Sequence, residues 1–253
     1  MDFTVDLEGR VAVVTGAAGG IGRAVALQLA SSGADVAVTD IHQRVEPLCE
    51  LAAEISQMGR KSIATTADVT DRTDIDHLIG DVLNAFGAVD LLVNVAGVYL
   101  TDPIREYSES AWDKTMAVNL KGPFLTCQAF SKVMCEQRQG NIINIASDSA
   151  IDVAEGDGPY ASSKAALVTL TRHIAREMGE HNIRANVIAP GWVKTDMTSF
   201  VWSDPQLLEE AEAGVPLGFL AEPEDIGNVV LFLASGASRY VNGQLIVANG
   251  GRV

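Results

Sequence analysis

The stretch VAVVTGAAGGIG, from Val11 to Gly22, joins a continuously apolar run to a glycine-rich turn. An apolar run without alternation is typical of a β-strand that is buried on both faces. The glycines at positions 16, 20 and 22 permit a tight turn and close approach of the backbone to a ligand. The stretch therefore predicts a strand, a turn and a helix whose N-terminus can face an anion such as a pyrophosphate.

The same alternation of apolar runs and amphipathic segments continues along the whole chain. The apolar runs are Val11–Gly16, Ala34–Asp40, Lys61–Asp68, Asp90–Gly97, Asn141–Ser147, Ile183–Gly191 and Gly243–Gly250. Helical periodicity covers Ile21–Ser32, Val45–Met58, Asp74–Phe86, Glu109–Glu136, Tyr160–Gly179 and Pro223–Ala234. This order predicts an α/β Rossmann fold, a doubly wound, seven-stranded parallel sheet with helices on both faces.

No linker, repeat or shift in composition divides the 253 residues, so we expect a single domain over residues 1–253. Its cofactor-binding part would span about residues 1–145, and its catalytic and substrate part about residues 146–253. Residues 194–220 carry two prolines and two glycines, and are expected to form an irregular lid beyond the sixth strand. Ligands bind at that edge of such sheets.

Charge and cysteine content narrow the function further. A formal net charge of −15 argues against nucleic acid or anionic lipid as a partner. The three cysteines lack the spacing of a zinc site or a disulfide framework, so we expect no metal and buried free thiols. The N-terminus lacks a basic and apolar leader, and no apolar run is long enough to span a membrane. A cytoplasmic protein is the expectation.

Asp40 ends the second predicted strand, about 20 residues after the glycine turn. A carboxylate there can accept hydrogen bonds from the hydroxyls of an adenosine ribose and would repel a 2′-phosphate. These properties favour NAD over NADP as the cofactor. Arg44 lies near enough in sequence to offer a basic group to such a phosphate, so NADP stays open.

Tyr160 and Lys164 lie one helical turn apart, so both side chains can approach the same ligand. A tyrosine is a poor base at neutral pH, and a nearby cation that stabilises the phenolate would lower its pKa. Tyr160 could then exchange a proton with a substrate hydroxyl. Without the glycine turn, this spacing would be equally compatible with a pair of surface residues that has no catalytic role.

Six motifs in order resemble those of the short-chain dehydrogenase/reductase family, in its single-domain branch of about 250 residues. They are TGxxxGxG at Thr15–Gly22, a variant of NNAG at Asn94–Gly97, the helix asparagine Asn119, the serine Ser147, YxxxK at Tyr160 and Lys164, and PG at Pro190–Gly191. Val95 replaces the second asparagine of NNAG, and Asn249 stands where the family often has aspartate. Gly16, Gly19 and Gly22 also match the two-domain epimerase branch, against which the short length argues.

The resemblance implies a role for each matching residue. Tyr160 would be the general acid/base, Lys164 would lower its pKa and hold the nicotinamide ribose, Ser147 would orient the substrate oxygen, and Asn119 would anchor a water relay. The implied NAD-binding residues are Gly16, Gly20, Ile21, Gly22, Asp40, Ile41, Asp68, Val69, Asn94, Ala96, Gly97, Tyr160, Lys164, Pro190, Gly191, Val193 and Thr195. Ser147, Tyr160 and Trp192 would bind the substrate.

The substrate itself is less constrained by the sequence. Trp192, Phe200, Trp202 and Phe219 flank the lid and could bind an apolar or cyclic alcohol, or simply pack the lid onto the core. Four acidic residues between Ser147 and Tyr160 could suit a polyol or sugar, although solvated loop charges explain them as well. The expected substrate is therefore a secondary alcohol and its ketone.

Together these features predict an NAD-dependent alcohol dehydrogenase or carbonyl reductase. Two alternatives stay open, an NADP-dependent 3-oxoacyl thioester reductase and a non-catalytic protein that senses a dinucleotide. The helix after Tyr160 is apolar on more than one face, notably at Ala165, Leu167, Val168 and Leu170. Such a helix needs cover, and the resemblance implies that a homotetramer supplies it.

Overall fold

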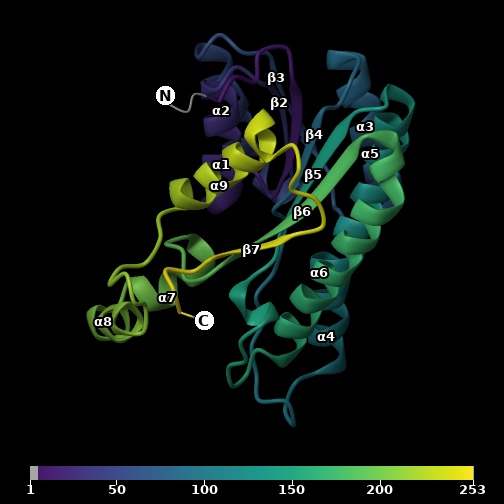
Figure 1. Cartoon of the computed structure of the whole chain (residues 1–253). Coiled ribbons are helices and arrows are strands. Elements are labelled where there is room, and N and C mark those ends of the chain that lie inside the picture. Colours follow the sequence, from purple (N-terminus) through teal and green to yellow (C-terminus); the bar gives the residue numbers. More distant parts are fainter. Residues whose placement is uncertain (1–4, 253) are drawn as a thin grey trace.

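The computed structural model describes residues 5–252 and confirms the predicted Rossmann architecture (Figure 1). Seven parallel strands form one sheet in the order β3-β2-β1-β4-β5-β6-β7. The strands are β1 (Val11–Thr15), β2 (Asp35–Asp40), β3 (Ser62–Thr66), β4 (Leu91–Asn94), β5 (Gly140–Ile145), β6 (Ile183–Pro190) and β7 (Leu245–Ala248). The sequence also predicted that the N-terminus carries no leader. Part of that prediction falls on residues 1–4, which lie outside the described residues.

Helices cover both faces of the sheet. They are α1 (Gly20–Ser31), α2 (Val45–Gln57), α3 (Arg72–Phe86), α4 (Glu109–Met116), α5 (Gly122–Gln137), α6 (Gly158–Met178), α7 (Ser199–Trp202), α8 (Pro205–Ala213) and α9 (Pro223–Ala234). Figure 1 shows α1, α2 and α9 on one face and α3, α5 and α6 on the other. The chain reverses its direction of winding between β1 and β4, which leaves a crevice beyond the carboxyl ends of these strands.

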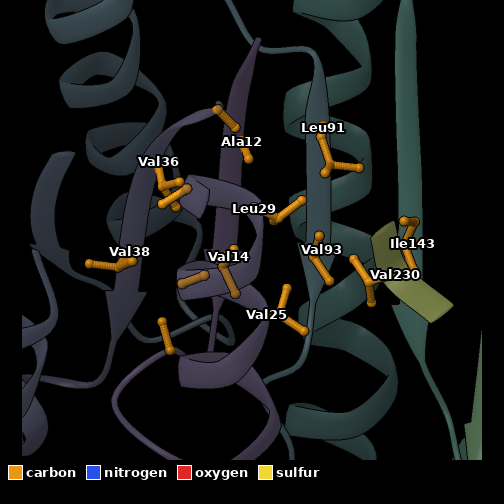
Figure 2. Packing of buried hydrophobic residues seen from close by; sticks show 14 of the residues in the cluster. Ala12, Val14, Val25, Leu29, Val36, Val38, Leu91, Val93, Ile143 and Val230 are labelled. Carbon is orange, nitrogen blue, oxygen red and sulfur yellow. The ribbon is translucent and has the colours of Figure 1, made fainter. Parts of the chain in front are cut away.

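Alternate residues of each strand enter two separate cores, which explains why the strands are apolar throughout. Val14 and Val93 point toward α1 and α9, where they meet Leu29 and Val230 (Figure 2). Neighbouring residues in the same strands point toward α3, α5 and α6 and form the second core, which includes Phe130. The sheet is thus held rigidly between two layers, and its carboxyl edge is free to carry a site.

The long helix expected over Glu109–Glu136 is interrupted in the structure. A π-helical segment, Ala117–Lys121, separates α4 from α5 and contains the fully buried Asn119. Pro123, the second residue of α5, has no backbone N–H for a regular helical hydrogen bond. The interruption turns Asn119 inward and is typical of π-bulges at functional positions.

Residues 194–220 are more regular than expected, because they contain α7 and α8. The side chain of Asp204 caps α8 by accepting hydrogen bonds from the N–H groups of Gln206 and Leu207, at 2.9 and 3.3 Å. Pro205 occupies the first helical turn, where proline fits without loss. The pair Asp204-Pro205 is therefore a helix-start signal that the sequence interpretation overlooked.

All three cysteines are free, but the expectation that all are buried holds only for Cys127. Cys127 is buried, Cys135 is partly buried, and Cys49 is exposed on the solvent side of α2. Within residues 5–252, no helix is long and apolar enough to cross a membrane.

Candidate active site

A cleft of about 660 Å³ lies at the carboxyl edge of the sheet, where the glycine turn, β4, β5 and β6 end. Most of the residues expected to bind a dinucleotide line it. They are Gly16, Gly20, Ile21, Asp40, Ile41, Asp68, Val69, Ala96, Gly97, Tyr160, Lys164, Pro190, Gly191, Val193 and Thr195. The fold thus brings segments from both halves of the chain to one cavity.

The glycine turn fits closely against the segment that follows β4. A Cβ atom on Gly16 would lie 2.7 Å from the backbone of Ala96, and the φ of Gly16 is +64°. A Cβ atom on Gly22 would lie 2.1 Å from the carbonyl oxygen of Gly16. The hydroxyl of Thr15 accepts hydrogen bonds from the N–H groups of Val95 and Ala96, at 3.1 and 3.3 Å. The turn therefore leaves the N-terminus of α1 open to the cleft, as binding of a phosphate requires.

Gly22 and Asn94 do not line the cleft, and their expected role in cofactor binding stays a prediction. Gly22 allows α1 to pack onto the turn. Asn94 is buried beneath the cleft, where its amide nitrogen donates to Asn144 Oδ1 at 2.8 Å and its oxygen accepts from Thr126 at 2.7 Å. Both residues therefore fix segments that border the cleft, Gly22 the start of α1 and Asn94 the end of β4.

Asp40 ends β2 and faces the cleft beside the turn. Its carboxylate accepts hydrogen bonds from the N–H groups of Ala18, at 3.0 Å, and Ile41, at 2.8 Å. Arg44 also lines the cleft, and its guanidinium donates to the carbonyl oxygen of Ala18 at 3.2 Å. The same guanidinium lies 3.8 Å from a carboxylate oxygen of Asp196. Asp40 and Arg44 thus both line the end of the cleft where the adenosine ribose is predicted to bind.

Lys164 lies within the cavity on α6, one turn after Tyr160, and is only 4% exposed. Its ammonium lies 5.6 Å from the centre of the Tyr160 ring and donates a hydrogen bond to the carbonyl oxygen of Ile145 at 3.0 Å. Burial lowers the pKa of Lys164 to about 8, because the low-polarity surroundings disfavour its charge. Burial of this ammonium group therefore destabilises the folded protein.

We expect Lys164→Met to stabilise the protein at pH 7 by about 1–3 kcal/mol, because the variant buries no charge. The cost of that charge is fully present below the folded-state pKa of about 8 and fades as the pH rises toward the ordinary value of 10.5. Urea unfolding without cofactor at pH 7 and pH 10 measures the difference, which should shrink at pH 10. Lys132→Met, on an exposed position of α5, should change the stability by less than about 0.5 kcal/mol.

The pKa of Tyr160 is raised in the structure, whereas the sequence predicted that Lys164 would lower it. Burial is the main cause, and a hydrogen bond with Ser147 opposes it. The charges of Asp148 and Asp157 raise the pKa further, because they repel a phenolate. The protein alone thus keeps Tyr160 protonated, as a general acid must be before it donates a proton.

Asn119 is wholly buried and does not line the cleft. Its amide accepts a hydrogen bond from the N–H of Val98 at 2.8 Å and donates one to the carbonyl of Val98 at 2.9 Å. It also donates to the hydroxyl of Ser163 at 3.2 Å. Asn119 therefore fixes the segment after β4 against α6, and its expected part in a water relay stays a prediction.

Ser147 follows β5 and lines the cleft beside Tyr160. Its hydroxyl accepts a hydrogen bond from the N–H of Ser149 at 3.2 Å and donates one to Asp148 at 3.4 Å. Asp148 is buried, and burial raises the pKa of its carboxyl group, which the charge of Arg252 opposes. Ser147 therefore lies in the cleft, where the catalytic serine is expected, and it also caps the short helical turn Asp148–Ala150.

An aromatic cluster borders the substrate side of Tyr160. The ring centres of Tyr99 and Tyr160 are 4.8 Å apart, and those of Tyr99 and Phe200 are 6.4 Å apart. Trp192 lies 6.2 Å from Phe200, and the guanidinium of Arg252 lies 5.8 Å from the centre of the Trp192 ring. Sequence reasoning missed Tyr99 and Arg252, because only the fold brings the end of the chain and the end of β4 next to α6.

Comparison with known proteins agrees with this geometry. The profile of a family described as enoyl-(acyl carrier protein) reductase matches residues 16–252. A 3-oxoacyl-[acyl-carrier-protein] reductase from Thermotoga maritima is 39% identical over 247 residues, which cover 98% of this chain and 99% of that protein. The chain belongs to the short-chain dehydrogenase/reductase family.

Two solved structures of similar proteins extend the comparison. A short-chain type dehydrogenase/reductase from Mycobacterium marinum superimposes with a TM-score of 0.92 at 34% identity, covering 99% of this chain and 98% of that one. A gluconate 5-dehydrogenase from Burkholderia cenocepacia, in complex with NADP and tartrate, gives a TM-score of 0.93 at 30% identity, covering 98% and 97%. The protein is therefore an oxidoreductase of the short-chain dehydrogenase/reductase family, which uses nicotinamide dinucleotides.

Proposed function

We propose that the protein is an NAD(H)-dependent oxidoreductase that interconverts a secondary alcohol and its ketone. The observation that carries this proposal is that Tyr160, Lys164 and Ser147 line the same cleft as the glycine turn and Asp40. A dinucleotide that lies along this cleft, with its ribose at Asp40, would place its other end near Tyr160. When bound, the nicotinamide supplies the hydride acceptor or donor.

The chain's own groups would handle the proton. In ketone reduction, Tyr160 donates its proton to the substrate oxygen, and Ser147 donates a hydrogen bond that orients the same oxygen. In alcohol oxidation, Tyr160 must first lose its proton, which its raised pKa opposes. The positive charge of an oxidised nicotinamide would favour the phenolate, and so would the ammonium of Lys164 below its pKa of about 8.

The choice of NAD rests on Asp40. Its carboxylate faces the cleft and would repel a 2′-phosphate, whereas the nearby cation, Arg44, is already bonded to Ala18 and faces Asp196. The related gluconate 5-dehydrogenase is complexed with NADP, so the same fold also accommodates a 2′-phosphate. The cofactor preference therefore depends on whether repulsion by Asp40 or attraction by Arg44 dominates at a 2′-phosphate.

We expect Asp40→Ala to lower kcat/KM for NAD by about 10-fold or more and to reduce the preference for NAD over NADP by about 10- to 100-fold. The physical reason is the loss of charge-assisted hydrogen bonds to the ribose and of repulsion toward a phosphate. Steady-state rates with both cofactors measure the preference. Arg44→Ala is the matched control and should change it by less than about threefold. A loss of NADP use in Arg44→Ala, together with an unchanged preference in Asp40→Ala, would contradict the proposal.

A second candidate, an NADP-dependent 3-oxoacyl thioester reductase, is favoured by Arg44 in the cleft and by the related reductase of Thermotoga maritima. Turnover of a panel of secondary alcohols and β-ketoacyl thioesters with NAD and NADP separates the two. Strict use of NADP with the thioesters would support this second candidate. Binding of a dinucleotide without turnover of any of them would support a sensing protein.

The homotetramer stays a proposal that rests on the family resemblance. The chain itself buries Leu167 and Val168, which the sequence had suggested a partner must cover. Leu170 and Phe124 border a groove on the outer side of α4, α5 and α6, and Phe124 is exposed. These are the side chains that a neighbouring subunit would bury.

A further inference from the structure

Three threonines lie side by side near the carboxyl ends of β1, β2 and β3. Thr39 of β2 pairs in register with Thr15 of β1 on one side and with Thr65 of β3 on the other. Residues that pair in register point to the same face of a sheet. Ala37, two residues before Thr39, packs into the core under α3 and α5, so the row of threonines faces that side. Of the three, only Thr39 lines the cleft.

The hydroxyl of Thr39 differs from its two neighbours in having no partner. The hydroxyl of Thr15 accepts two backbone N–H groups from the segment after β4, and that of Thr65 donates to Asp81 at 3.3 Å. Thr39 is wholly buried, and its hydroxyl oxygen has no hydrogen-bond partner within the described part of the chain. A buried hydroxyl without a partner is costly, so a ligand that supplies one gains affinity.

We propose that the hydroxyl of Thr39 forms a hydrogen bond with the adenine base of the bound dinucleotide, so that Thr39 contributes to recognition of the base. The inference rests on the cofactor binding in the proposed function and assigns a further residue to the same site. Adenine carries ring nitrogens that accept hydrogen bonds and an amino group that donates them. A threonine hydroxyl can pair with either kind of group.

The position of Thr39 favours the base over the other parts of the cofactor. Asp40, the next residue, points to the opposite face of the sheet, where its carboxylate accepts a hydrogen bond from the glycine turn. On the side that Thr39 faces, the cleft is lined by Val69, Ala96 and Val118, which pack against α3 and α5. A flat base fits between apolar walls with one polar group at their floor, whereas a phosphate or a ribose needs several polar partners.

The test compares two variants that each remove one hydroxyl from the same row. Thr39→Val removes the unpartnered hydroxyl, and Thr65→Val removes a hydroxyl that has a partner in the protein. Three quantities are measured: the dissociation constant of NADH by fluorescence titration, that of ADP-ribose by calorimetry, and the melting temperature without ligand. ADP-ribose retains the adenosine half of the cofactor and lacks the nicotinamide.

We expect Thr39→Val to weaken the binding of both NADH and ADP-ribose by about 3- to 10-fold, because one hydrogen bond is lost. The same variant should raise the melting temperature without ligand by about 2–4 °C, because an unpartnered buried hydroxyl is removed. Thr65→Val should leave both dissociation constants within about twofold and should not raise the melting temperature, since Asp81 loses a donor. The combination of weaker binding and higher stability separates a binding role from a structural one.

The pair Thr39→Ser and Thr39→Ala covers the case that Thr39→Val does not fold. Serine retains the hydroxyl and alanine lacks it, so NADH should bind more weakly to Thr39→Ala than to Thr39→Ser by the same factor of about 3–10. Unchanged affinities in the variants without the hydroxyl, or weaker binding of NADH with unchanged binding of ADP-ribose, would overturn the inference while the dehydrogenase function stands. A wild-type protein that bound neither ligand would overturn the cofactor binding of the proposed function, and this inference with it.

Discussion

Tyr160→Phe is expected to lower kcat for the best alcohol substrate by about 1,000-fold and to leave the dissociation constant for NAD within about threefold. The substitution removes one oxygen atom and retains the ring that packs 4.8 Å from Tyr99. General acid/base groups contribute about 100- to 10,000-fold to rates, and Tyr160 lines the cleft with its ring centre 5.6 Å from the ammonium of Lys164. Stopped-flow turnover and a fluorescence titration with NADH measure the two effects.

Tyr240→Phe is the matched control, because Tyr240 is 99% exposed and does not line the cleft. Its kcat should equal that of the wild type. If Tyr160→Phe retained full turnover, Tyr160 would have no part in proton transfer and the proposed mechanism would be wrong. A large loss of NAD binding with little loss of kcat would instead assign Tyr160 to cofactor binding alone.

Gly22→Ala is expected to have the largest effect on stability, about 3–5 kcal/mol, and to abolish cofactor binding. The new Cβ would lie 2.1 Å from the carbonyl oxygen and 2.8 Å from the carbonyl carbon of Gly16. Both atoms belong to the backbone of a turn that is fixed against Ala96, so neither can move without opening the turn. Urea unfolding and titration with NADH measure the stability and the affinity.

Gly80→Ala offers a control with the same chemical change. Gly80 lies within α3, and a Cβ atom there would meet nothing within 4 Å. Alanine in the interior of a helix should stabilise the protein by about 0.5–1 kcal/mol. Normal stability and NADH affinity in Gly22→Ala would show that the turn can relax, and that close packing of α1 on β1 is not required.

Most of the fold followed from local patterns in the sequence. The seven strands and α1, α2, α3, α6 and α9 lie within a few residues of their predicted bounds. The reason is that a strand buried on both faces must be apolar throughout, and a helix on a sheet must be apolar along one stripe. The break at Ala117–Lys121 and the helices of the lid were missed, since a π-bulge has no simple periodicity and short helices carry little of it.

The sequence by itself determined the glycine turn, the acidic end of β2 and the spacing of Tyr160 and Lys164, because each depends on residues that are near one another along the chain. Only the tertiary structure decided which groups surround Tyr160. Arg252 and Asp157 are 95 positions apart in the numbering, yet both act on Tyr99. The lowered pKa of Lys164 was likewise decided by burial, and the raised pKa of Tyr160 was decided mainly by burial. Desolvation and Coulomb interactions depend on distance in space, and for these residues that distance is set by the fold.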